Sequence, residues 1–377
     1  MRVRLGDYIK EYSVKNKNNE DIPVYSVSNS LGFCKDYFGK EVASKNKTTY
    51  KIVPRGCFAY NPSRINVGSV DWQNEEERVI VSPLYNVFSV SPLLDQQYLL
   101  YYLKSNVTLA RIKAVASGSV RDNLKLSMLY EFPIDLISLD QQYEVVSILN
   151  AIQKIIDLYQ KELSGLDELV RARFVEMFGD ENNSKGWEIV NIEDVANVQV
   201  GVVIKPSQYY TDQDSGIKAF RSLNIGNGYI KDDDWVYFSE EGNKKNKKSI
   251  LSTNDVLIVR SGAPGTACVV TSEYAGSNAI DVIIAHPNFQ KVDSHYLCTY
   301  TNMPHGKSQI IEGTGGAAQQ HFNVGKYNKL KLMLPPLEYQ KQYVKFLEEI
   351  DKSRSRIQKS LEASQELFDS LMQEYFG

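Results

Sequence analysis

The 377-residue sequence has only four cysteines and no long apolar run. Cys34, Cys57, Cys268 and Cys298 are widely separated, and no two have the C-x-x-C spacing of a zinc site or a redox pair. We expect them to be buried side chains in a reducing cytoplasm. The longest apolar runs are far shorter than the ~20 residues of a membrane helix, and the N-terminal segment lacks the apolar core of a secretory signal. We therefore expect a cytoplasmic protein with no membrane association.

The usual signatures of catalysis are also missing. Thr301 stands where a phosphate-binding loop ending at Gly306-Lys307-Ser308 would need glycine, and Asn61-Pro62-Ser63 lacks the second proline and the aromatic residue of an amino-methyltransferase loop. No G-x-S-x-G turn occurs, and Asp232–Asp234 is interpreted as a solvated turn. The histidines lack H-E-x-x-H spacing: His286, His295, His305 and His321. We predict that this chain is not an enzyme and holds no catalytic residue, metal or cofactor.

The net charge of −3 is unusual for a nucleic-acid-binding protein, but the charge is unevenly distributed. Residues 1–135 hold 18 basic and 14 acidic residues, whereas residues 136–186 hold 5 and 9. The acidic residues are therefore concentrated in the segments expected to be long helices, and the globular segments can still present a basic face.

The chain contains an internal repeat. Phe178-Gly179 and Phe376-Gly377 lie 198 residues apart, and the same offset pairs Leu139 with Leu337 and Gln142 with Gln340. At an offset of 200, Lys45-Asn46-Lys47 falls on Lys245-Asn246-Lys247. So many matches in one order indicate a duplicated module with small loop insertions.

Each module ends in a long amphipathic segment. Residues 140–178 carry apolar side chains at alternating gaps of three and four, and residues 338–376 repeat the pattern. This spacing is typical of a coiled-coil seam, and each helix would be roughly 57 Å long. Neither helix could bury its seam alone, so we expect the two to pack antiparallel. Arg354 and Ser364 replace Ile156 and Leu166 in the second seam, and we expect them at its edge or against a partner.

The remaining segments are predicted to be mixed α/β (α+β) domains with many short strands. The expected strands include Tyr50–Val53, Arg78–Ile80 and Tyr85–Val90 in the first domain. The second offers Trp235–Phe238, Asp255–Arg260, Ala267–Thr271 and Ala279–Ile284. Short helices are expected at Asp95–Lys104 and Ser294–Thr301. The predicted organisation is a domain at 1–135, a helix at 136–180, a domain at 181–335 and a helix at 336–377.

Two lysine clusters are candidates for contact with nucleic-acid phosphates. The first is Lys45, Asn46 and Lys47, and the second is Lys244, Lys245, Lys247 and Lys248. Their recurrence in both modules favours this function over an ordinary solvated loop. Such lysines would supply affinity without sequence information.

Reading bases requires planar side chains that offer paired hydrogen bonds, such as Arg, Asn and Gln. Candidates in the first domain are Asn61, Arg64 and Arg121. Candidates in the second are Arg221, Asn224, Arg260, Gln319, Gln320 and His321. The last three belong to a glycine-rich segment, 313–321, that could enter a groove or could be an ordinary connection.

The chain resembles the specificity subunits of Type I restriction-modification systems. The motif that carries the resemblance is Leu-Pro-Pro-Leu-Glu-Tyr-Gln at 334–340, which leads directly into the second long helix. The first module has Leu-Ile-Ser-Leu-Asp-Gln-Gln at 136–142, without the prolines. The segment 256–270 is also similar to a strand and turn of the family, and the order of domain and helix matches along the whole chain.

The resemblance implies two target recognition domains, related by an approximate two-fold axis, that read the two unlike halves of a non-palindromic double-stranded DNA site. The helices would set the spacing and dock two modification (methyltransferase) subunits, which bind S-adenosylmethionine. Restriction subunits would join to cleave DNA, and the complex would be prokaryotic and cytoplasmic.

Two alternatives remain open. One is a specificity subunit of a Type IIB-like enzyme or a fused specificity and cleavage polypeptide, although the missing methyltransferase motifs argue against a fusion. The other, from a different class, is a two-headed coiled-coil scaffold or adhesin.

Overall fold

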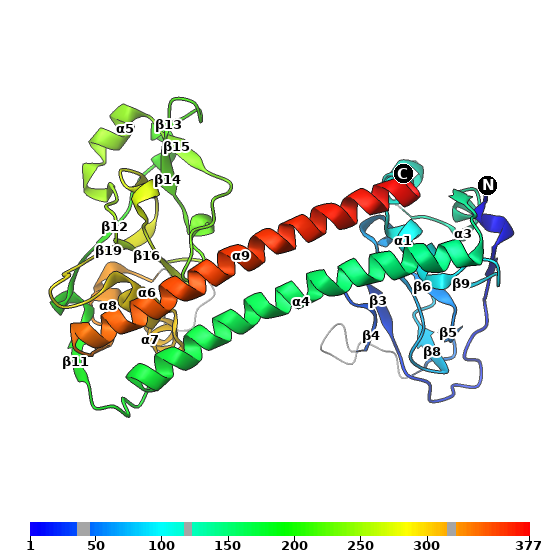
Figure 1. The fold of residues 1–377 in the computed structure, drawn as a ribbon, viewed down its shortest axis with the longest axis horizontal. Helices are drawn as coiled ribbons and strands as arrows, with labels where there is room; N and C mark the ends of the chain where they lie inside the picture. The colour runs from blue at the N-terminus through cyan, green and yellow to red at the C-terminus, as the bar shows by residue number, and fades with distance from the viewer. Residues whose placement is uncertain (36–45, 117–122, 315–321) are drawn as a thin grey trace. The chain divides into compact units, whose positions relative to one another are not determined.

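The computed structural model describes residues 1–35, 46–116, 123–314 and 322–377, and it divides into two units. Unit 1 consists of residues 1–161 and 357–377, and unit 2 consists of residues 162–356. The two long helices are α4 (Leu139–Phe178) and α9 (Leu337–Phe376). Each of them begins in one unit and ends in the other, as the labels in Figure 1 allow the reader to follow.

Unit 1 is built around a four-stranded antiparallel sheet in the order β2–β9–β6–β7, formed by Ile9–Glu11, Asn86–Val90, Phe58–Tyr60 and Val70–Trp72. The two ends of the domain meet where β1 (Arg2–Arg4) pairs with β10 (Pro133–Asp135). Two further antiparallel pairs join β3 (Ser26–Ser28) to β4 (Gly32–Cys34) and β5 (Lys51–Pro54) to β8 (Arg78–Val81). Three helices follow β9: α1 (Gln96–Lys104), α2 (Asn106–Ala116) and α3 (Leu126–Leu129).

Unit 2 repeats this arrangement. Its antiparallel sheet has the order β12–β19–β16–β17, formed by Ala196–Val200, Val282–Pro287, Val256–Val259 and Ala267–Val269. β11 (Glu188–Asn191) pairs with β20 (Lys331–Leu334) as β1 pairs with β10. Among the described residues, three helices again follow this sheet: α6 (Ser294–Asn302), α7 (Pro304–Thr314) and α8 (Val324–Asn328).

The two domains differ in their second layer of strands. In unit 1 this layer consists of the pairs β3–β4 and β5–β8, which a parallel bridge between Val24 and Ile80 joins, whereas in unit 2 it is a four-stranded mixed sheet in the order β13–β15–β14–β18. These strands are Tyr210–Thr211, Val236–Phe238, Ile217–Phe220 and Asn278–Ala279. One further helix, α5 (Glu240–Lys245), lies between β15 and β16. The duplication is therefore closely kept in the first sheet and the helices, whereas the second layer differs in the number and extent of its strand pairings.

The mixed α/β fold class and the duplicated order of domain and long helix are confirmed. The expected strands and short helices correspond to observed elements with differences of a few residues at their ends, except Ala279–Ile284, which is divided between β18 and β19 in two different sheets. The apolar β-branched runs of the first sheets account for this success, because both faces of β16 are buried.

Matching tyrosines attach the short helices to the last strand of each domain. The two tyrosines of one domain and their acceptors are each 198 residues from those of the other. The acceptors lie in the last strand of each domain, β10 in unit 1 and β20 in unit 2. The hydroxyl groups of Tyr98 and Tyr102 donate to the carbonyls of Asp135 and Pro133, at 3.1 and 2.6 Å, and those of Tyr296 and Tyr300 donate to Met333 and Lys331, at 2.7 and 2.9 Å.

Two equivalent glutamines fix the start of each long helix. Gln142 is fully buried, and its Oε1 accepts from the Asp95 N–H at 2.8 Å. Its Nε2 donates to the carbonyls of Leu93 and Ile137 at 3.0 and 2.9 Å. Asp95 in turn caps α1, because its side chain accepts from the Tyr98 N–H. A single buried amide thus joins the long helix, the strand-to-helix loop and the cap of the short helix.

Gln340 repeats this network in unit 2. Its Oε1 accepts from the Asp293 N–H at 2.8 Å, and its Nε2 donates to the carbonyls of Lys291 and Pro335 at 3.2 and 2.7 Å. Asp293 caps α6. The glutamine of the 334–340 motif is therefore the residue that sets the angle between domain and helix.

The helix ends follow from local sequence. Ser138 and Gln141 form a capping box at the start of α4. The Ser138 N–H donates to Gln141 Oε1 at 3.1 Å, and the Gln141 N–H donates to the Ser138 hydroxyl oxygen at 3.3 Å. Helix α9 follows Pro335-Pro336, which cannot donate backbone hydrogen bonds. Gly179 ends α4 with φ of +89°, in the left-handed region that favours glycine.

Each unit contains the start of one long helix and the end of the other. In unit 1, Val145 and Leu149 of α4 share a core with Met372 and Phe376 of α9. In unit 2, Phe174 and Phe178 share a core with Tyr343. The two helical segments of each unit therefore run antiparallel, as the seam predicts.

Aromatic side chains bring each helix end onto a domain. The Phe376 ring lies 5.1 Å from that of Tyr98 in unit 1, and the Phe178 ring lies 4.8 Å from that of Tyr296 in unit 2. These pairs are related by the repeat offset, so each domain receives the start of its own helix and the end of the other. Among the described helices, none has a stretch apolar and long enough to cross a membrane.

We predict that Gln142→Ala destabilises the protein by about 2–4 kcal/mol, because it removes a fully buried amide and leaves one backbone N–H and two backbone carbonyls without their partner. Urea unfolding followed by circular dichroism measures the change. Gln160→Ala is the matched control on the exposed part of the same helix, and it should cost less than about 0.5 kcal/mol. Equal effects of the two substitutions would show that the buried network is not important for stability.

Candidate nucleic-acid interface

The second lysine cluster lies on two consecutive helical turns. Ser239 caps α5 by accepting from the Gly242 N–H at 3.1 Å, and the 3₁₀ turn Lys247–Ser249 follows it. A buried network holds these turns: the Ser249 hydroxyl donates to Asn278 Oδ1 at 2.6 Å, and Asn278 Nδ2 donates to Asn243 Oδ1 at 2.6 Å. The cluster is therefore a helical surface rather than the loop that the sequence suggests.

The lysines of this cluster are not equivalent. Lys244 and Lys245 form ion pairs with Glu240 and Glu241 one turn earlier, at 3.3 and 2.7 Å. The hydrogen bond from Lys245 to Glu241 raises the pKa of the lysine and lowers that of the glutamate. Much of their charge is thus compensated locally.

Lys247 and Lys248 are exposed on the following turn. Within the described chain, neither forms an ion pair. The Lys248 carbonyl accepts from Gln199 Nε2, so the backbone of this turn is attached to β12 of the first sheet. Among the lysines predicted to contact phosphates in unit 2, Lys247 and Lys248 are therefore the two whose positive charge no described carboxylate neutralises.

The first lysine cluster has a different local structure. Lys45 lies outside the described residues. Asn46 is exposed, and its Oδ1 accepts from the Thr48 N–H and hydroxyl at 3.0 and 2.6 Å. Lys47 is half-buried and lies 3.8 Å from an Asp21 carboxylate oxygen. The sequence match of the two clusters therefore does not correspond to one shared structure.

Asn61 and Arg64 follow β6 in unit 1. Asn61 Oδ1 accepts from the Ser63 N–H and hydroxyl at 3.1 and 2.9 Å, which closes a tight turn. Arg64 comes next and is exposed. Arg64 therefore remains accessible to a ligand, whereas the side-chain oxygen of Asn61 already accepts two hydrogen bonds within the domain.

Asn224 requires a correction, because it is fully buried. Its Oδ1 accepts from the Arg221 N–H at 2.9 Å and its Nδ2 donates to the Asp233 carbonyl at 2.7 Å. Both amide groups are satisfied inside the domain, so the predicted base contact is wrong and the residue has a structural role. The Arg221 guanidinium is also engaged, at 3.1 Å from Asp234.

Arg260 requires the same correction. Only 14% of its side chain is exposed, and its Nη1 pairs with Asp281 at 2.6 Å. Its Nε donates to the Phe322 carbonyl at 3.0 Å. Arg260 therefore ties the end of β16 to the segment that begins at Phe322, instead of reaching a base. Arg121, Gln319, Gln320 and His321 lie outside the described residues, so their predicted contacts remain predictions.

A cluster around Lys218 was not predicted from the sequence. The Lys218 ammonium lies 4.8 and 5.0 Å from the ring centroids of Trp235 and Tyr274. Asp232 accepts from Lys218 at 2.7 Å and from Trp235 at 2.6 Å, and these two hydrogen bonds lower the pKa of the carboxyl. Lys218 lies in β14, Asp232 and Trp235 precede β15, and Tyr274 ends the 3₁₀ turn Ser272–Tyr274. Only the folded domain brings these residues together, so no local spacing could reveal them. In the described part of the chain, no three side chains form a possible metal cluster.

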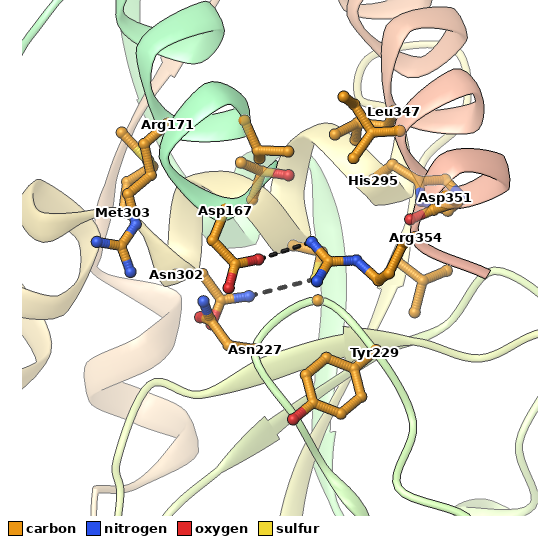
Figure 2. A pocket seen from close by; sticks show the side chains of 16 residues that line it. Asp167, Arg171, Asn227, Tyr229, His295, Asn302, Met303, Leu347, Asp351 and Arg354 are labelled. Carbon is orange, nitrogen blue, oxygen red and sulfur yellow. Dashed lines mark hydrogen bonds and ion pairs between the residues drawn. The ribbon is translucent and has the colours of Figure 1, made fainter. Parts of the chain in front are cut away.

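An ion pair beside a small pocket in unit 2 accounts for Arg354, a polar residue in the second seam. Figure 2 shows Arg354 of α9 extending toward Asp167 of α4, and the two side chains pair at 2.6 Å. The pocket of about 90 Å³ is also lined by Tyr229 and His295. It is smaller than the roughly 300–1,000 Å³ of ligand sites. Arg354 thus contacts the other helix at the seam's edge, while the Ser364 hydroxyl donates to Ser360 on its own helix at 2.8 Å.

Comparisons with known proteins identify one family. The model of the Type I restriction modification DNA specificity domain matches residues 4–168 and 184–365, once for each repeat. The chain is 22% identical to the Type I restriction enzyme MjaVIII specificity subunit of Methanocaldococcus jannaschii, over 93% of this chain and 85% of the relative.

Two solved structures share the fold of the whole chain. One is a chain from a structure titled for the structural basis of complex assembly and conformational transition of the type I R-M system. It has a TM-score of 0.61 at 14% identity, and the match covers 100% of this chain and 97% of the other. The other is the Type-I restriction-modification system S subunit from M. genitalium, with a TM-score of 0.57 at 13% identity and coverage of 100% and 96%. At these identities the likeness shows the fold alone.

We predict that Lys247→Ala plus Lys248→Ala weakens binding to every duplex DNA tested and lowers the slope of log K against log salt by about 1.8, because each phosphate contact contributes about 0.9. Lys244→Ala plus Lys245→Ala is the matched pair on the preceding turn, and it should have a smaller effect. Fluorescence anisotropy over a range of salt concentrations measures both. A change in sequence preference would instead show that these lysines contact bases.

Proposed function

We infer the function of this chain from the premise that it belongs to the Type I restriction modification DNA specificity domain family, whose model covers both of its repeats. Its role is that of a specificity subunit of a Type I restriction-modification system. The finer assignments rest on how the repeat is built. The two copies keep the first sheet, the short helices and the buried glutamines, and they differ in the second layer of strands.

We propose that each domain reads one half of a bipartite DNA target. The observation that carries this proposal is the unequal divergence of the two copies. A second layer made of two bridged strand pairs in one domain and of a four-stranded sheet in the other presents different side chains to a ligand. Different reading surfaces select different base sequences, so the target is non-palindromic.

The long helices set the distance between the half-sites. The Gln142 and Gln340 networks attach each domain to the start of a 40-residue helix, so helix length determines how far apart the domains can act. Two modules of this kind address half-sites about one DNA turn apart, on the order of 10 base pairs.

The chemistry belongs to partner subunits. Two modification subunits dock on the helices, bind S-adenosylmethionine and methylate adenine, and restriction subunits join them to cleave DNA. This chain supplies recognition without catalysis. The type I R-M complex named for one of the similar structures supports an assembly of this kind.

Methylome sequencing of a bacterial host that expresses this chain with its modification subunit tests the proposal. We expect one bipartite methylated-adenine motif with two unlike halves and an unread spacer. A host without the chain is the control and should lack this motif. A continuous or palindromic motif would contradict the proposal.

The alternatives give different outcomes in the same host. A Type IIB-like complex would produce cleavage on both sides of the motif without a separate translocating subunit. A two-headed scaffold protein would produce no methylated motif, and the purified chain with its partner would show no salt-dependent affinity for duplex DNA.

A further inference from the structure

The loop after the first strand of the unit 2 sheet carries two exposed apolar side chains. Val203 and Ile204 lie between β12 and the 3₁₀ turn Pro206–Tyr209, and they retain 50% and 79% of their surface. We call these two residues the apolar tip. Lys205 follows with φ of +45° and ψ of +55°, in the left-handed region that side chains other than glycine rarely adopt. Backbone strain of this kind clusters at functional sites, and the exposed pair adds little to the core.

Backbone hydrogen bonds fix the position of the apolar tip in unit 2. The Gly201 N–H donates to the Val282 carbonyl of β19 at 2.9 Å, and the Val202 N–H donates to the Ala279 carbonyl of β18 at 2.7 Å. A Cβ atom at Gly201 would lie 2.4 Å from the Ala279 oxygen, so only glycine allows this approach. The tip is therefore held at the junction of the first sheet and the second layer.

The lysine-bearing turns contact the chain on both sides of the apolar tip. Before the tip, Gln199 Nε2 donates to the Lys248 carbonyl. After the tip, the Tyr209 carbonyl accepts from the N–H of Ser239, the cap of α5, at 2.8 Å. Lys205 is exposed and forms no ion pair within the described residues. The apolar tip thus lies among cationic side chains that remain accessible.

The corresponding loop of unit 1 has a different character. It follows β2, and Asn19, with φ of +51°, has the left-handed conformation that Lys205 has in unit 2. The preceding residues are Lys17 and Asn18, both exposed and polar. Asparagine adopts the left-handed region more readily than lysine does. The loop is therefore apolar and strained in unit 2, where unit 1 has a polar and relaxed one.

An apolar tip flanked by lysines complements the major groove at a thymine. The base edges in that groove offer hydrogen-bond donors and acceptors, and the C5-methyl group of thymine is their apolar feature. Phosphates line the groove on both sides, where lysines can contact them. A membrane surface also combines negative charge with apolar groups, but binding to it scales with buried apolar area, which two side chains supply poorly.

We propose that the apolar tip contacts thymine C5-methyl groups in the half-site that unit 2 reads, with Ile204 as the residue that selects thymine. This inference rests on the proposed function, which supplies duplex DNA as the ligand. Lys205 contacts a neighbouring phosphate and holds the tip in the groove. Asn18 stands at the matching place in unit 1 and offers no apolar contact, so this selection is confined to one half of the target.

Replacing thymine by deoxyuridine tests the inference, because it removes only the C5-methyl group. The probe is a duplex carrying the motif found by methylome sequencing, with its thymines replaced one at a time, and the protein is the complex of this chain with its modification subunit. Loss of the contacted methyl group should raise the Kd about fourfold, as expected for one buried carbon. Ile204→Ser should bind the thymine and deoxyuridine duplexes equally. Fluorescence anisotropy measures each Kd.

Asn18→Ser is the matched control in unit 1 and should keep the fourfold difference between the two duplexes. Circular dichroism melting compares the folding of both variants with that of the unsubstituted chain. No effect of deoxyuridine at any position, or an unchanged difference in Ile204→Ser, would overturn the inference while leaving the proposed function intact. Binding to anionic lipid vesicles that Ile204→Ser abolishes would assign the tip to a membrane instead. Absence of any bipartite methylated motif would overturn both proposals.

Discussion

The buried glutamine at the start of each long helix is the contact on which the rest of the structure depends. Gln142 and Gln340 each accept from the N–H of an aspartate that caps a short helix. Each also donates to two backbone carbonyls, one in the loop before that short helix and one just before the long helix. Because the amide is buried, these bonds are not exchanged for water, and the angle between domain and helix is fixed. The tyrosine bonds and the ring contacts at the far helix end then complete each domain on that frame.

This frame explains how one duplicated module serves two different purposes. Positions that must match in both copies are those that build the frame: the first sheet, the caps and the seam. Positions that can change without harm are the second-layer strands and the outward helix faces, because neither contributes to the attachment. The different second layers give each domain its own surface, as the proposed reading of two unlike half-sites requires.

Much of the frame could be predicted from the sequence, because its signals are local or periodic. The seam spacing predicted both helices, and the repeat offset predicted the matching domains. The individual ligand contacts could not be predicted in the same way. Asn224 and Arg260 have the side-chain types of base contacts, yet the fold uses them for internal hydrogen bonds and an ion pair. Whether an arginine is free or engaged depends on partners far away in sequence, such as Asp281 for Arg260.

Helix length, transmitted through the glutamine networks, is proposed to set the spacing of the DNA half-sites. Deleting residues 159–165 and 357–363 together removes seven residues from each helix and keeps the heptad phase. Methylome sequencing of a host expressing this shortened chain with its modification subunit is the most direct test. Seven residues correspond to about 10.5 Å of helix, or roughly 3 base pairs, so both half-sites should be unchanged and the spacer shorter by that amount. An unchanged spacer in an active complex would contradict the account.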